Sequence, residues 1–134
     1  SWNKCTGISF VNGCFGIAFG KTILNDPRWV ALGGLSATST TTILYSDNGI
    51  EWKNTTGNTF SNAGYDVSFG KTTTNVPLWV AIGEEVDGNP SREVLYSDNG
   101  ISWVSVTNNL GSIPLLGGGV ISNVFTHGVK SIFD

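Results

Sequence analysis

The chain repeats itself at an interval of about 50 residues, and this duplication constrains its fold more than any other feature. The octapeptide YSDNGIEW at residues 45–52 returns as YSDNGISW at residues 96–103. When residues 2–34 are laid over residues 52–84, 15 of the 33 positions are identical without a gap, and the match resumes after one inserted residue. The fold must therefore be built from two equivalent units.

Each unit contains four segments with the pattern of a β-strand. Apolar and small or polar residues alternate in the first segment, and the second is apolar on both faces, as in a strand covered from both sides. The four pairs of segments are 15–19 and 65–69, 29–32 and 78–82, 43–46 and 94–97, and 50–52 and 101–104. Eighteen glycines favour short strands joined by tight turns. The sequence predicts an all-β fold of β-propeller blades with four antiparallel strands each, and a β-sandwich is the alternative.

We expect the chain, residues 1–134, to form a single β-repeat domain or a segment of a propeller. The first repeat covers about residues 3–52, the second about 53–103, and a divergent partial repeat covers 104–134, with strand candidates at 119–125 and 129–133. Ser1-Trp2 matches the end of a fourth strand. Two blades are fewer than the four to eight that close a propeller, and the chain has no methionine. We expect either a segment of a longer propeller or copies that associate into a ring.

Composition excludes several classes of function. The net charge is only −3 and the basic residues are scattered singly, so the sequence predicts no nucleic-acid partner. No apolar run reaches the length of a membrane span. The chain has one histidine, His127, and no metal-binding or phosphate-binding motif, so we expect neither a metal nor another cofactor. Cys5 and Cys14 form either a local disulfide or two small buried thiols, and the sequence leaves both open.

The repeated octapeptide is a hairpin signal, because Asn and Gly tolerate the positive φ angles of tight β-turns. We expect the Asp carboxylate to accept hydrogen bonds from turn amides and the Trp to pack under the turn, so Asp→Ala should cost about 1–3 kcal/mol. The expected turn locks are Asp47, Gly49 and Trp52 in the first repeat and Asp98, Gly100 and Trp103 in the second. The strand tryptophans are predicted to be core residues: Trp29, Trp52, Trp79 and Trp103.

These octapeptides resemble the Asp-box, or BNR, repeat of sialidase-like β-propellers, whose pattern is Ser/Thr-x-Asp-x-Gly-x-Thr-Trp. The chain resembles a divergent member, since Tyr45 and Tyr96 replace the first Ser/Thr and Glu51 replaces the usual Thr. In that family the box lies between the third and fourth strands of a blade, away from the active site. Sialidases bind the substrate carboxylate with three arginines, whereas this chain has only Arg28 and Arg92.

The sequence therefore predicts a non-catalytic recognition or structural propeller module, on an extracellular or particle surface such as that of a virion. Its ligand would be a glycan or a protein, or its partner the rest of a propeller. The alternative is a segment of a sialidase-like glycoside hydrolase whose catalytic residues lie outside this chain. No catalytic residue is assigned. The loop between the second and third strands differs between the repeats, and loops of this kind are where specificity is placed. The candidate binding residues are Asp87, Asn89, Arg92 and Glu93.

Overall fold

The computed structural model describes residues 1–34, 40–84 and 92–106, and these residues form strands and turns without a helix. The prediction of an all-β fold is confirmed for this part of the chain. The first repeat forms β1 (Thr6–Gly7), β2 (Cys14–Lys21), β3 (Pro27–Gly33), β4 (Ile43–Ser46) and β5 (Glu51–Asn54). The second forms β6 (Thr56–Gly57), β7 (Ala63–Lys71), β8 (Pro77–Glu84), β9 (Arg92–Ser97) and β10 (Ser102–Ser105). The strand candidates at 119–125 and 129–133 lie outside the described residues.

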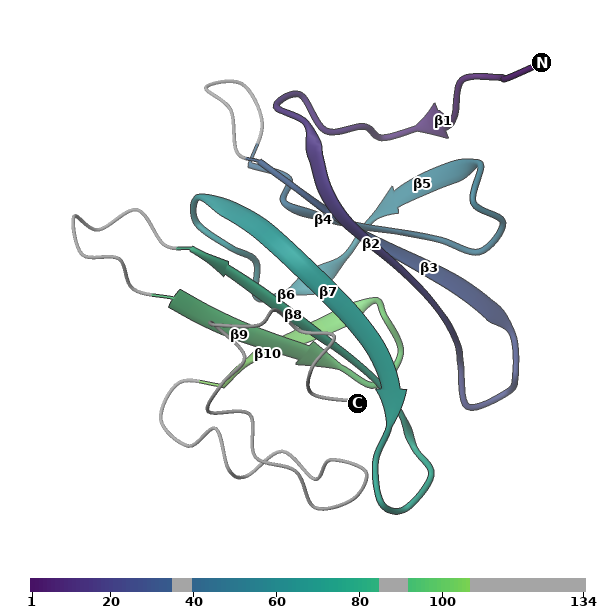
Figure 1. The fold of residues 1–134 in the computed structure, drawn as a ribbon, viewed down its shortest axis with the longest axis vertical. Helices are drawn as coiled ribbons and strands as arrows, with labels where there is room; N and C mark the ends of the chain where they lie inside the picture. The colour runs from purple at the N-terminus through teal and green to yellow at the C-terminus, as the bar shows by residue number, and fades with distance from the viewer. Residues whose placement is uncertain (35–39, 85–91, 107–134) are drawn as a thin grey trace.

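Each repeat forms one five-stranded sheet (Figure 1). The strand order is β1-β5-β4-β3-β2 in sheet 1 and β6-β10-β9-β8-β7 in sheet 2. Four strands in each sheet are antiparallel and correspond to the four predicted segments. The prediction of four-stranded antiparallel units is wrong in one respect, because a fifth, parallel strand makes both sheets mixed. Two packed five-stranded sheets are also compatible with the β-sandwich alternative.

The fifth strand is a Thr-Gly pair, and in sheet 2 it follows the last strand of sheet 1 in the chain but pairs with the last strand of sheet 2. Thr56–Gly57 comes directly after β5 in the chain, yet the amide of Thr56 donates to the carbonyl of Ile101 at 2.8 Å. Gly57 has a φ of +85°, and an added Cβ would lie 2.3 Å from the carbonyl oxygen of Trp103. Only glycine fits there. Gly7 has the same geometry against Trp52, which is why the Thr-Gly pair is repeated.

The register of the strands gives each sheet two distinct faces, because successive side chains point to opposite sides. In sheet 1, Ile17 pairs with Ala31 and Ala31 with Leu44, and these side chains share a face with the Phe19–Trp29 pair. We call this surface the front face. The front face of sheet 1 consists of Ile17, Phe19, Trp29, Ala31, Leu44 and Trp52, and that of sheet 2 of Val67, Phe69, Trp79, Ala81, Leu95 and Trp103.

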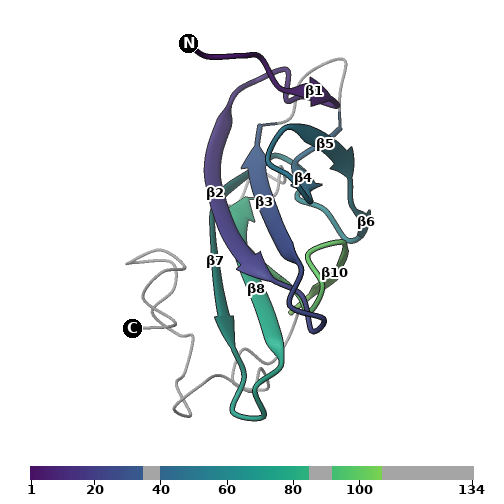
Figure 2. The same ribbon diagram turned by 90° about the vertical axis from the view of Figure 1, so that its right-hand side faces the viewer.

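The core lies between the back face of sheet 1 and the front face of sheet 2. The back face of sheet 1 consists of Ala18, Val30, Leu32, Ile43 and Tyr45, and these residues belong to the same cluster as the front-face residues of sheet 2. Figures 1 and 2 show β2 and β7 side by side, so the sheets pack with matching strands in contact. At the closest approach, the ring of Phe69 lies against Gly20, where an added Cβ would be 2.3 Å from the ring. The two repeats therefore stack front to back.

Candidate functional site

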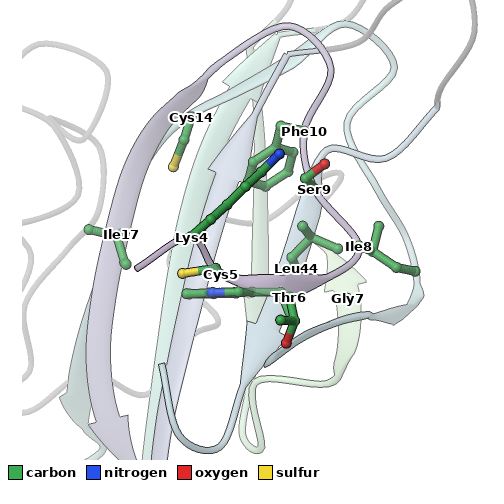
Figure 3. A pocket seen from close by; sticks show the side chains of 12 residues that line it. Lys4, Cys5, Thr6, Gly7, Ile8, Ser9, Phe10, Cys14, Ile17 and Leu44 are labelled. Carbon is green, nitrogen blue, oxygen red and sulfur yellow. The ribbon is translucent and has the colours of Figure 1, made fainter. Parts of the chain in front are cut away.

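A groove of about 600 Å³ lies over the front face of sheet 1, between that face and the segment that contains β1 (Figure 3). Its floor is apolar and includes Ile17, Ala31 and Leu44, with the ring of Trp52 beside them. Its outer wall is formed by residues 4–10, including Phe10. Concave, mainly apolar surfaces with a few polar groups are the usual form of a binding site. This groove is the candidate functional site.

The groove exists because the two equivalent front faces differ in what covers them. Ile17 is 52% exposed, whereas its counterpart Val67 in sheet 2 is 1% exposed. Phe10 is half-buried at the groove, whereas Phe60, its counterpart, is 1% exposed under sheet 1. The front face of sheet 2 is thus an interface inside the molecule, whereas the equivalent front face of sheet 1 lies at an open groove.

The burial of the tryptophans differs between the two sheets in the same way. Trp79 and Trp103 are buried in the core between the sheets, as predicted, whereas Trp29 and Trp52 of the open face are only half-buried. The pairing of rings is nevertheless the same in both repeats: the ring centroids of Phe19 and Trp29 are 4.7 Å apart, and those of the equivalent pair in sheet 2 are 4.6 Å apart. Packing within a sheet is therefore set by the repeated sequence, whereas burial of a sheet face is set by the sheet that lies next to it.

Two thiols line the groove. Figure 3 shows Cys5 and Cys14 at its wall, and both are free thiols in exposed residues. Neither alternative from the sequence fits in full, because no disulfide joins them and neither residue is buried. The Cys14 thiol lies partly shielded from water, and this desolvation raises the pKa of the thiol above its ordinary value. It therefore stays protonated, and unreactive, to a higher pH than a free cysteine.

The hairpin turns of the octapeptides are held by serine and asparagine. In the second repeat, Ser97 Oγ accepts hydrogen bonds from the amides of Asn99 and Gly100 at 3.3 and 2.8 Å. The Asn99 side-chain oxygen accepts two more, from the amides of Ile101 and Ser102, both at 2.8 Å. In the first repeat, Ser46 Oγ accepts the equivalent bonds from the amides of Asn48 and Gly49. The Asn48 side-chain oxygen accepts those from the amides of Ile50 and Glu51.

These bonds correct the role assigned to the aspartates. The carboxylate of Asp98 is exposed and accepts no hydrogen bond from the described residues, and that of Asp47 binds Arg28 instead of turn amides. Gly49 and Gly100 both have a φ of +77°, the positive value expected for these turns. The indole nitrogen of Trp103 donates to the carbonyl of Gly100 at 3.2 Å. Both turn residues that the sequence reasoning missed lie inside the repeated octapeptide, where their recurrence was a signal.

Arg28 connects the two repeats at their turn ends. Its guanidinium donates to the carboxylate of Asp47 at 2.8 and 2.9 Å and to the backbone carbonyl of Asn99 at 2.8 Å. It also lies over the ring of Tyr45, 5.4 Å from the ring centroid. Because Leu78 occupies the equivalent position in the second repeat, this contact is specific to the junction between the two sheets.

Of the four loop residues proposed for binding, the structure describes the strand positions of Arg92 and Glu93, and Glu93 does not line the groove. Asp87 and Asn89 lie outside the described residues. Arg92 begins β9, where its backbone pairs with Glu84, and Glu93 pairs with Gly83. The carboxylate of Glu93 accepts a hydrogen bond from the Ser105 hydroxyl at 2.8 Å.

Further classes of site are absent from the described part of the chain. Residues 1–34, 40–84 and 92–106 contain no group of three or more His, Cys, Asp or Glu side chains that could hold a metal ion. Over the same residues, no helix is long and apolar enough to cross a membrane. The chain matches no protein-family model, no curated protein and no solved structure.

Proposed function

We propose that the chain is a β-propeller-type repeat module that works by non-covalent association of its sheet faces, as a structural or recognition unit of an extracellular or particle surface. The front-to-back stacking of two equivalent sheets carries this proposal. Such stacking is directional, so one end of the stack presents an apolar front face whose counterpart inside the molecule is an interface. The resemblance of both octapeptides to the Asp-box supports the propeller as the architecture in which this stacking continues.

The side chains of the open face favour a role in binding over a role in catalysis. The groove is lined mainly by aliphatic and aromatic side chains, with Lys4 as its one charged residue among those that line it. Contiguous exposed apolar surface of this kind marks interaction sites in water-soluble proteins. The exposed members are large: Ile17 is 52% exposed and Phe19 is 44% exposed. A protein surface is therefore the ligand that this face fits best.

The mass of the chain in solution, measured by native mass spectrometry over a range of concentrations, tests this function. The chain should associate as its concentration rises, and Ile17→Lys on the open face should weaken that association. Ile23→Lys is the matched control, because Ile23 is 70% exposed but lies at the β2–β3 turn, outside the groove. A mass that stays monomeric throughout, with no effect of Ile17→Lys, would contradict the proposal. Release of fluorophore from a fluorogenic sialoside by the purified chain would contradict a non-catalytic role.

A further inference from the structure

The molecule contains a filled version of its own open groove. The front face of sheet 2 is covered by the back face of sheet 1. Among the described residues no sheet covers the equivalent face of sheet 1, where Ile17 and Phe19 are exposed although Ala31 and Leu44 are buried. We propose that the groove binds a further sheet of this same repeat, which presents a back face of the type found in the first repeat. This inference rests on the proposed function and names the partner of the site.

The filled junction shows which polar contacts such a partner makes. Thr42 is fully buried there, and its hydroxyl donates to the carbonyl of Phe60 at 3.3 Å and accepts from the amide of the same residue at 3.2 Å. At the turn end, Arg28 donates to the carbonyl of Asn99. A hydroxyl and a guanidinium of the first repeat therefore fix the position of one sheet on the next.

The open face offers receiving groups of the same kind, with one difference: Cys14 stands at the position of Gly64, where an added Cβ would lie 2.9 Å from the Cβ of Leu32, so a covering sheet must shift there. Phe10 stands at the position of Phe60, Asn48 at that of Asn99, and Cys5 at that of Thr55. Thr55 directly follows β5, beside the Leu44–Asn54 pair, and its hydroxyl donates to the carbonyl of Ile43 at 3.4 Å, so this residue is held at the edge of sheet 1 where the chain passes to sheet 2. The apolar floor corresponds residue by residue, from Ile17, Ala31 and Leu44 to Val67, Ala81 and Leu95. The groove is thus a receiving surface for a Thr42-type hydroxyl and an Arg28-type guanidinium.

The second repeat does not carry these two groups. Leu78 replaces Arg28 and cannot donate a hydrogen bond. Glu93 replaces Thr42, and an ionised carboxylate accepts but does not donate, so it cannot satisfy a backbone carbonyl. The back face of the first repeat does carry them, but within each copy of the chain it is buried against sheet 2. The matching partner is therefore an additional sheet of the first-repeat type, and two copies of the chain can meet through their open front faces only without these two polar contacts.

A fusion that supplies this sheet tests the inference. Residues 1–52 are placed ahead of residue 3, so that Trp52 takes the place of the equivalent Trp2 and the local sequence at the join is kept. The two cysteines of the added copy are changed to serine, so that only the original Cys5 and Cys14 react with a disulfide reagent. We expect these thiols to react at least about 10-fold more slowly than in the unfused chain, because a stable cover must open before they are reached.

Matched fusions separate the parts of the argument. Leu32→Asp in the added copy puts a charge on its back face, and the thiols should then react at the unfused rate. Arg28→Leu combined with Thr42→Val in the added copy should lose most of the protection, and full protection would refute the role of the two polar groups. If the thiols of the first fusion react as fast as those of the unfused chain, the inference fails, whether or not the added copy is folded. That failure would leave the concentration-dependent association of the unfused chain unaffected.

Discussion

Ser97→Ala should destabilise the protein far more than Asp98→Ala, although the two residues are neighbours in the same turn. Ser97 is 2% exposed, and its hydroxyl accepts from two turn amides and donates to the side-chain oxygen of Asn99 at 3.0 Å. The alanine variant leaves both amides without this acceptor. The Asp98 carboxylate is exposed and makes no such bond among the described residues, so its removal orphans nothing in them.

The size of the effect follows from these contacts. A buried amide that loses its acceptor costs about 1–3 kcal/mol. The Gly100 amide is buried and holds the shorter bond, whereas the Asn99 amide is half-buried and holds the longer one. We therefore expect about 2–3 kcal/mol in the free energy of unfolding for Ser97→Ala, and within about 0.5 kcal/mol for Asp98→Ala. At about 4 °C per kcal/mol for a chain of this size, Ser97→Ala should lower the Tm by about 8–12 °C.

Urea unfolding followed by tryptophan fluorescence, together with thermal unfolding followed by circular dichroism, measures both variants. Ser46→Ala is the matched variant in the first repeat, where the Gly49 amide bonds to the serine hydroxyl at the same distance of 2.8 Å. It should also be destabilising. If Asp98→Ala costs as much as Ser97→Ala, the carboxylate holds the turn after all, and the reasoning from these hydrogen bonds is refuted.

Three other outcomes are expected. Gly57→Ala should cost more than about 2 kcal/mol in unfolding free energy, since a left-handed φ is strained for alanine and the Cβ meets a backbone carbonyl. Gly13 has a similar φ but its nearest contact is at 3.4 Å, so Gly13→Ala should cost about 1–2 kcal/mol. Equal costs for the two variants would contradict the argument. Arg28→Leu should lower the unfolding free energy by about 1–2 kcal/mol, and part of this loss should disappear in high salt. No change in urea unfolding would show that the junction does not need the arginine. In a Cys5→Ser variant, alkylation of Cys14 should become half-maximal at a higher pH than that of a free cysteine peptide, because desolvation raises the pKa of the thiol. The folded state then holds the proton more tightly than the unfolded state, so stability should fall as pH rises from the ordinary cysteine pKa through the raised one, and an unshifted alkylation profile would remove this effect.

The sequence by itself determined four of the five strands of each unit and their order of appearance. Alternation of apolar residues is a local property with a period of two, so the segments at 15–19 and 65–69 could be recognised without any knowledge of their neighbours. The positive φ of Gly49 and Gly100 is local as well, because it depends on the turn alone. The Thr-Gly strands were missed, since two residues carry no periodicity and their pairing partner lies more than 40 residues away.

Only the tertiary structure decided which of two equivalent surfaces is covered. Trp52 and Trp103 close the same octapeptide, yet one is half-buried at a groove and the other is 1% exposed in the core. The sequence also could not decide which side chains hold the turn, because the Asp, the Ser and the Asn of the octapeptide all carry oxygens that could accept hydrogen bonds from the turn amides. Geometry selects the Ser and the Asn. The physical reason is that burial and hydrogen bonding depend on what lies opposite a residue in space, and in this protein the opposite surface is supplied by a neighbouring sheet, which the local pattern of a repeat does not specify.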